Sequence, residues 1–133
     1  MTYNLIGRHQ SKLVRTRIAS NLSPWLANTK VGDIYTVPIS HGEGRFIGDQ
    51  ALIEALIQKG QVATQYVDED GLPSSKVQFN PNGSVYGIEG ITSPDGRVFG
   101  KMGHSERIGS GLYQNVPGSF DMGMFQAAVK YFL

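Results

Sequence analysis

The chain has 133 residues, a formal net charge of +1, 40% hydrophobic and 17% charged residues, and no cysteine. This length allows one domain with a hydrophobic core, and the absence of cysteine excludes a disulfide scaffold and a cysteine metal site. The composition argues against a disordered chain, and no basic run or bilayer-length apolar run indicates binding to nucleic acid or to a membrane.

Three strands are predicted in the first half of the chain, over residues 11–20, 33–40 and 61–67. Pro38 indicates that the second of these strands lies at an edge or an end of its sheet, because proline cannot donate to a ladder. A helix is predicted over residues 49–59, with Asp49 as its N-cap and Gly60 at the C′ position. The apolar face of this helix is expected to consist of Leu52, Ala55 and Leu56.

The predicted elements of the second half are a turn over residues 80–84, a hairpin of 85–92 with 97–102, an irregular loop over 109–118 and a helix over 119–132. Gly83 suits the turn because it can adopt positive φ, and we interpret the turn as structural. In the loop after the first strand, Trp25 and Leu26 are expected to pack into the core. The apolar stripe of the final helix is predicted to consist of Phe125, Ala128, Val129 and Phe132.

The hairpin leads into the segment 100–107, which holds a histidine and a glutamate two residues apart. In extended backbone such residues project to the same side, so Glu106 can lie beside His104 while Ser105 points away. A carboxylate beside an imidazole orients the ring, which provides the base and the orienting group of a nucleophilic triad. A cysteine nucleophile is absent, so the pattern indicates half of an active site. On spacing alone, a surface ion pair is the commoner explanation.

A second polar segment follows the strand over residues 33–40 and contains His41, Gly42, Glu43 and Arg45. This is the position at which α/β folds place ligand contacts, and the small residues let backbone N–H groups approach a ligand closely. A turn with solvated charges is the alternative. His9 is expected at the surface, and the wide spacing of the three histidines argues against a zinc site.

Taken together, the motifs resemble the glutamine amidotransferase domain of phosphoribosylformylglycinamidine synthase, a family of purine biosynthesis. The residues that carry the resemblance are ISHGEGRF, YVD, NPNGS, GITSPDGRV and the His-x-Glu of KMGHSER. It extends from about Gly7 to the C-terminus. The fold class that it implies is α/β: the C-terminal half of a class I glutamine amidotransferase (flavodoxin-like) domain, a mixed sheet with flanking helices. For the whole domain of the family it implies a mostly parallel sheet.

The resemblance also implies a division of roles. A cysteine on a strand-to-helix elbow attacks the glutamine side-chain amide, His104 shuttles the proton and Glu106 holds the histidine. The residues expected to line the glutamine pocket or to form a domain contact are His41, Gly42, Glu43 and Arg45. Ammonia passes to a separate synthetase domain, where ATP and magnesium activate formylglycinamide ribonucleotide. No cofactor and no metal are expected in this chain itself.

Two departures from the family pattern stand out. The family usually has proline on either side of the histidine, where this chain has Gly103 and Ser105. The cysteine-bearing segment is also missing, so residues 1–133 are interpreted as one partial domain that cannot hydrolyse glutamine alone. We expect glutamine, the cysteine-bearing half and the synthetase domain as partners in the cytoplasm, or a homo-oligomer that covers the exposed sheet. The alternative is a non-catalytic interaction module, which would have no chemical need for both His104 and Glu106.

Overall fold

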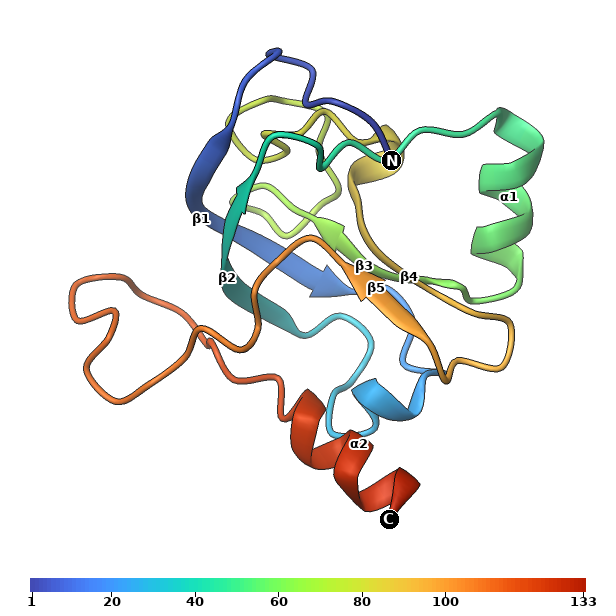
Figure 1. Ribbon diagram of the computed structural model, residues 1–133, viewed down its shortest axis with the longest axis vertical. Helices are drawn as coiled ribbons and strands as arrows, with labels where there is room; N and C mark the ends of the chain where they lie inside the picture. Colours follow the sequence, from blue (N-terminus) through green and yellow to red (C-terminus); the bar gives the residue numbers. More distant parts are fainter.

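The computed structural model describes residues 1–133 and is built on a five-stranded sheet in the order β2-β1-β3-β4-β5 (Figure 1). The strands are β1 (Gln10–Ile18), β2 (Ile34–His41), β3 (Val62–Tyr66), β4 (Ile88–Thr92) and β5 (Phe99–Lys101). The helices are α1 (Gln50–Gln58) and α2 (Met124–Phe132), with 3₁₀ turns η1 (Pro24–Leu26) and η2 (Val85–Gly87). The predicted strands and the hairpin are therefore confirmed, with ends that differ by a few residues.

The predicted α/β class with flanking helices is confirmed, but the sheet is neither mixed, as predicted for this chain, nor mostly parallel, as expected for the whole domain. Every pair in this chain, β1 with β2, β1 with β3, β3 with β4 and β4 with β5, is antiparallel. The single connection through a helix, β2–α1–β3, joins two strands that β1 separates. Parallel neighbours need such a crossover, and no adjacent pair in this chain has one.

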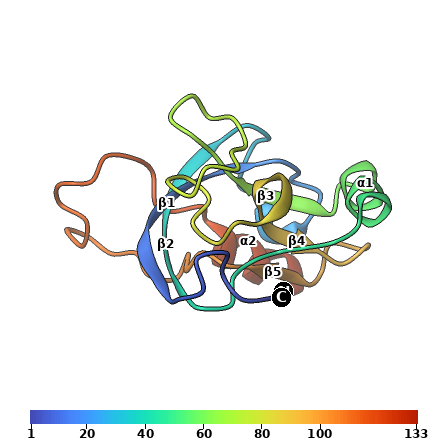
Figure 2. The same ribbon diagram turned by 90° about the horizontal axis from the view of Figure 1, so that it is seen from above.

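The sheet curls so that the chain leaving β5 returns to the outer edge of β2. The backbone N–H of His104 donates to the carbonyl of Pro38 at 2.8 Å, and the N–H of Thr36 donates to the carbonyl of Ser119 at 2.7 Å. Pro38 thus lies on an edge strand, as predicted. The loop between these two contacts projects from the sheet on the side away from α1 (Figure 2). The curl encloses a core of Val14, Val37, Ile39 and Tyr66, with Met102 packed against it.

Helix α1 begins and ends as predicted, and of its predicted apolar face Ala55 and Leu56 are partly buried, with Leu56 packed against the core, while Leu52 is exposed. The Asp49 carboxylate accepts from the N–H of Leu52 at 2.8 Å, and Gly60 adopts a φ of +67° after the last turn. Ile53 is 1% exposed, whereas Leu52 is 47% exposed, so the prediction for Leu52 was wrong. The cause is the position of the sheet, because Ile53 packs against Val62 and Ile88.

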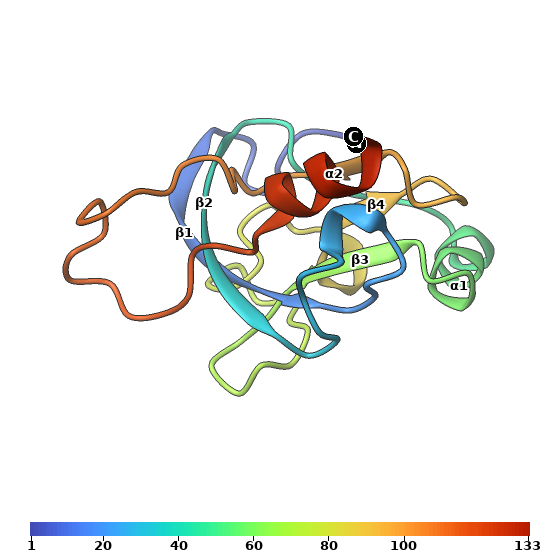
Figure 3. The same ribbon diagram turned by 90° about the horizontal axis from the view of Figure 1, so that it is seen from below.

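Helix α2 begins at Met124 rather than at residue 119, after Gly123 with a φ of +62°. Its buried residues are Met124, Ala127 and Ala128, so of the predicted stripe only Ala128 is buried. Helix α2 runs beside η1 (Figure 3). The Trp25 ring meets the rings of Phe125 and Phe132 at centroid distances of 6.5 and 6.1 Å, while Leu26 is fully buried. Neither helix has the length and apolar character that a bilayer crossing requires.

The difference in burial between Ile53 and Leu52 on α1 can be tested by stability measurements. Ile53→Ala should lower the free energy of unfolding by about 2–5 kcal/mol, because it leaves a cavity between the helix and the sheet. Leu52→Ala, one residue earlier on the same helix, should change it by less than about 1 kcal/mol, because that side chain is half exposed. Urea denaturation followed by circular dichroism measures both variants. Equal losses would show that α1 does not pack as described.

Candidate active site

His104 and Glu106 are brought into direct contact just after β5. The Nδ1 atom of His104 lies 2.7 Å from Oε1 of Glu106, which confirms the predicted pairing. The predicted extended backbone was wrong here. The chain forms a turn in which the N–H of Arg107 donates to the carbonyl of His104 at 3.1 Å. Ser105 is 6% exposed and its hydroxyl accepts from Lys101 Nζ at 2.9 Å, so it does point away from the pair.

The charge of Glu106 suits the orienting role. Partial burial raises its pKa, but its own backbone N–H and the hydrogen bond from His104 outweigh burial and bring the pKa below its ordinary value. The carboxylate is therefore ionised near neutral pH, and it accepts a hydrogen bond from the Nδ1–H group of His104. This tautomer leaves Nε2 of the imidazole with a lone pair, the state that a general base requires.

His41, at the end of β2, is the second histidine of the site. Its ring centroid lies 6.4 Å from that of His104. The Nδ2 group of Asn82 lies 2.9 Å from His41 Nε2 and donates to the Tyr66 hydroxyl at 3.0 Å. Burial first, and then the repulsion that two protonated rings would have, lowers the pKa of His41, although the carboxylate of Glu89 opposes this. His41 is thus a neutral imidazole held by an amide.

The other residues of this segment face the N-terminal residues and the 80–84 turn. The Nδ2 group of Asn4 donates to the carbonyl of His41 at 2.7 Å, and the Asn4 backbone N–H donates to the carbonyl of Gly42 at 2.9 Å. Arg45 Nε donates to the carbonyl of Gly83 at 3.1 Å, and Glu43 is exposed. Of the predicted pocket residues, His41 is therefore the one that the structure brings beside His104.

Sequence reasoning missed three buried polar side chains around the site, those of Asn82, Glu89 and Lys101. Asn82 is 0% exposed and contacts His41, whereas the side chain of Asn80 bonds only to Ser74 and Ser84, as the structural interpretation of their turn predicts. Glu89 and Lys101 form an ion pair at 3.3 Å behind His104. The signal that could have revealed Glu89 is a single carboxylate inside the apolar run of β4, since an unpaired charge is rarely buried.

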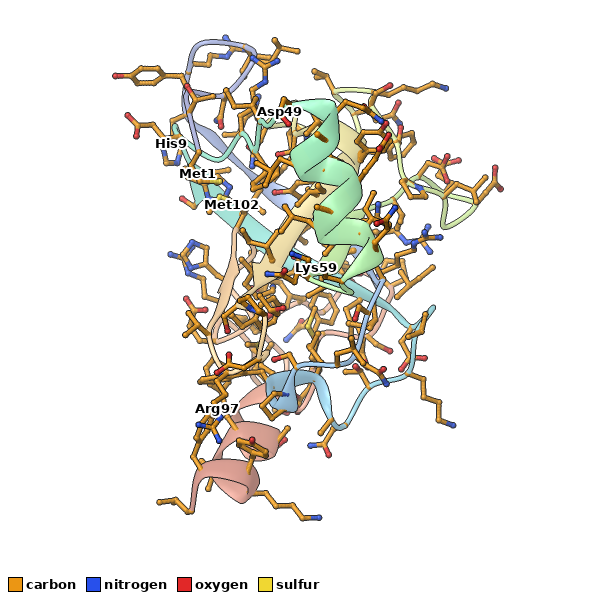
Figure 4. All side chains as sticks on the ribbon, turned by 90° about the vertical axis from the view of Figure 1, so that its right-hand side faces the viewer. Met1, His9, Asp49, Lys59, Arg97 and Met102 are labelled. Carbon is orange, nitrogen blue, oxygen red and sulfur yellow. The ribbon has the colours of Figure 1, made fainter.

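Two cavities lie on either side of β5. One of about 310 Å³ is lined by His104, Glu106 and the start of α2. The other, of about 370 Å³, is lined by Met1, Met102 and residues of β4, and the first two lie near each other in Figure 4. A ligand in the first cavity would meet the imidazole directly. The arrangement can orient and move a proton, and a nucleophile has to come from elsewhere because the chain holds no cysteine.

Comparisons with known proteins agree on one family. Residues 1–132 match the CobB/CobQ-like glutamine amidotransferase domain. The chain is 42% identical over 94 residues to the phosphoribosylformylglycinamidine synthase subunit PurQ of Thermomicrobium roseum, covering 71% of this chain and 39% of the relative. It is 34% identical over 118 residues to the same subunit of Aquifex aeolicus, covering 89% of this chain and 49% of that one.

Longer proteins and a solved structure match as well. The phosphoribosylformylglycinamidine synthase of Drosophila melanogaster is 38% identical over 130 residues, which are 96% of this chain and 10% of that protein. A chain in the structure of PurLQS from Thermotoga maritima superimposes with a TM-score of 0.72 at 25% identity, covering 99% of this chain and 52% of that one. The chain thus spans about half the length, or less, of the relatives it matches. It belongs to the family of CobB/CobQ-like glutamine amidotransferase domains, and within that family it is similar to the glutamine amidotransferase part of phosphoribosylformylglycinamidine synthase.

Proposed function

We propose that this chain supplies the histidine–glutamate half of the glutaminase site of phosphoribosylformylglycinamidine synthase. The observation that carries the proposal is the 2.7 Å contact between His104 Nδ1 and Glu106 Oε1. It provides the base and the orienting carboxylate of a nucleophilic triad, and it occurs in the segment that carries the resemblance. Residues 1–133 then form the C-terminal half of the glutaminase domain, and the nucleophile lies in the other half.

In the proposed reaction, a cysteine of the other half attacks the side-chain amide carbon of glutamine. Nε2 of His104 accepts the thiol proton and delivers it to the departing ammonia, while Glu106 stabilises the imidazolium. Water, deprotonated by the same imidazole, then hydrolyses the thioester to glutamate. Ammonia passes to the synthetase part, where ATP and magnesium activate formylglycinamide ribonucleotide. No step of that second chemistry is assigned to residues of this chain.

We assign His41 to the wall of the glutamine pocket and the rest of its segment to a domain contact. A neutral His41 ring 6.4 Å from His104 adds no positive charge beside the imidazolium that forms during proton transfer. Gly42 and Arg45 fix the segment through their contacts with Asn4 and Gly83. Glu43 is exposed and available to a partner.

Partners of the chain would be glutamine, the cysteine-bearing half and the synthetase part. Exposed apolar side chains support a partner surface beside α2: Val98 is 70% exposed, Val129 57% and Phe132 49%. A partner or self-association of the isolated chain can cover these side chains. A non-catalytic interaction module would use the same surface, so activity has to separate the two functions.

The catalytic role of His104 can be tested in the complex of this chain with the cysteine-bearing half and the synthetase. His104→Ala should lower glutamine-dependent synthesis by at least about 100-fold, because the general base is removed. Ammonia-dependent synthesis should be unchanged. His9→Ala is the matched control, since His9 is exposed and its ring contacts the Ser40 hydroxyl.

The readouts are glutamate release and amination of the ribonucleotide with either nitrogen source. Glutamine use by His104→Ala at the wild-type rate would contradict the catalytic assignment. If the wild-type halves bind each other and release no glutamate, the chain is an interaction module.

The half-buried His41 predicts a pH dependence of stability. Its pKa in the folded chain lies below the ordinary 6.5 because of burial, His104 and His9, with Glu89 opposing. As the pH falls through 6.5, the unfolded chain therefore binds a proton that the folded chain does not, and the folded state loses stability. His41→Gln should reduce the loss of urea-unfolding stability between about pH 7 and pH 5. An unchanged loss in His41→Gln, with His9→Gln as control, would contradict this.

A further inference from the structure

A buried ion pair lies behind the His104 turn and takes no direct part in the proposed chemistry. Lys101 Nζ lies 3.3 Å from Glu89 Oε1, and the side chains are 8% and 0% exposed. The two residues come from neighbouring strands, β5 and β4. Burying two charges removes them from water, a cost that their attraction often fails to recover, so a buried pair is weak evidence of a purely stabilising role.

Two of the remaining hydrogen bonds of the pair converge on Gly103, and the other two reach the hydroxyls of Thr64 and Ser105. Glu89 Oε1 accepts from the N–H of Gly103 at 2.5 Å, and Glu89 Oε2 accepts from the Thr64 hydroxyl. Lys101 Nζ donates to the carbonyl of Gly103 at 3.1 Å and to the Ser105 hydroxyl at 2.9 Å. The pair therefore holds both polar groups of the residue before His104 and the side chain of the residue after it.

These contacts account for the glycine at position 103. A proline at position 103 would have no N–H to donate to Glu89. A Cβ atom on Gly103 would also lie 2.6 Å from Cγ2 of Val37 and 2.9 Å from Oε1 of Glu89. Glycine fits this site, but it leaves the backbone freer than proline does. The buried pair restrains this glycine by hydrogen bonding to its N–H and its carbonyl.

We propose that Glu89 and Lys101 are positioning residues for His104. They do not touch the imidazole: they hold the Gly103 peptide, and the bond from His104 N–H to Pro38 fixes the other side of the turn. The ring and Glu106 are then presented in one orientation. Displacement of a catalytic group by about 1 Å can lower the rate about 100-fold. An unrestrained turn would therefore position a general base poorly.

The experiment removes both charges at once. Glu89→Met with Lys101→Met keeps side-chain volume and leaves no unpaired buried charge, so the full chain should fold with an unchanged or higher melting temperature. Hydrogen exchange at the Gly103 amide, followed by NMR, should nevertheless accelerate at least about tenfold, because a hydrogen bond to a charged group is lost. The His104 ring ¹⁵N signals should shift or broaden. Glu54→Gln, an exposed carboxylate on α1, is the matched control.

A second variant tests whether the charge of Glu89 or only the shape of its side chain matters. Glu89→Gln keeps the length and an acceptor oxygen, so exchange at Gly103 should accelerate less than in the double variant. Wild-type exchange at Gly103 and unchanged His104 ring signals in the double variant would overturn the proposal. So would a uniform rise of exchange across the sheet, which would mean that the pair only stabilises the fold.

The effect on turnover rests on the proposed function. In the reconstituted synthase, the double variant should lower kcat for glutamine at unchanged KM, and ammonia-dependent synthesis should remain. If His104→Ala has no effect on glutamine use, the proposed function fails. The positioning role is then still decided by the Gly103 and His104 signals, because they are measured without turnover.

Discussion

The return of the chain from β5 to the edge of β2 is the contact on which the rest of the structure depends. The bond from the His104 N–H to the Pro38 carbonyl curls the sheet and places the end of β5 beside the end of β2. His41 ends β2, so the same closure brings two histidines, 63 positions apart in the sequence, to a centroid distance of 6.4 Å. A flat sheet in this strand order would hold β2 and β5 at opposite edges. The candidate site therefore forms only because the sheet is curled.

Local signals in the sequence were sufficient for most elements. The Asp49 cap, the Gly60 stop and the edge position of Pro38 depend on the chemistry of single residues, and all three are present. The face that a helix buries depends instead on where the sheet lies, which is why Ile53 rather than Leu52 packs inward. Gly123, in the left-handed region, precedes a final helix shorter than its apolar pattern predicts.

For the site, the sequence indicated the pair of His104 and Glu106 because two positions of spacing bring them together in either an extended strand or a turn. It could not indicate Asn82, since its role arises only when His41 and Tyr66 converge on one amide. Lys101 was equally hidden, because a lysine in a strand is usually solvated. Whether a polar residue lies at the surface or in the site depends on partners that are distant in the sequence. The pattern of a single sequence does not reveal those partners.

The proposed base, His104, and its orienting carboxylate both lie within this chain. The carboxylate that orients His104 is two residues away, and the backbone that carries it is held by contacts to β2, β4 and β5. None of these contacts needs an atom from outside residues 1–133. A nucleophile from another segment would therefore meet an imidazole whose tautomer and orientation are already set. Because the imidazole is already oriented, it does not have to rearrange when the other segment binds, as a base formed only on binding would. Under the proposed function, this half would hold the base in place and the other half would bring the nucleophile to it.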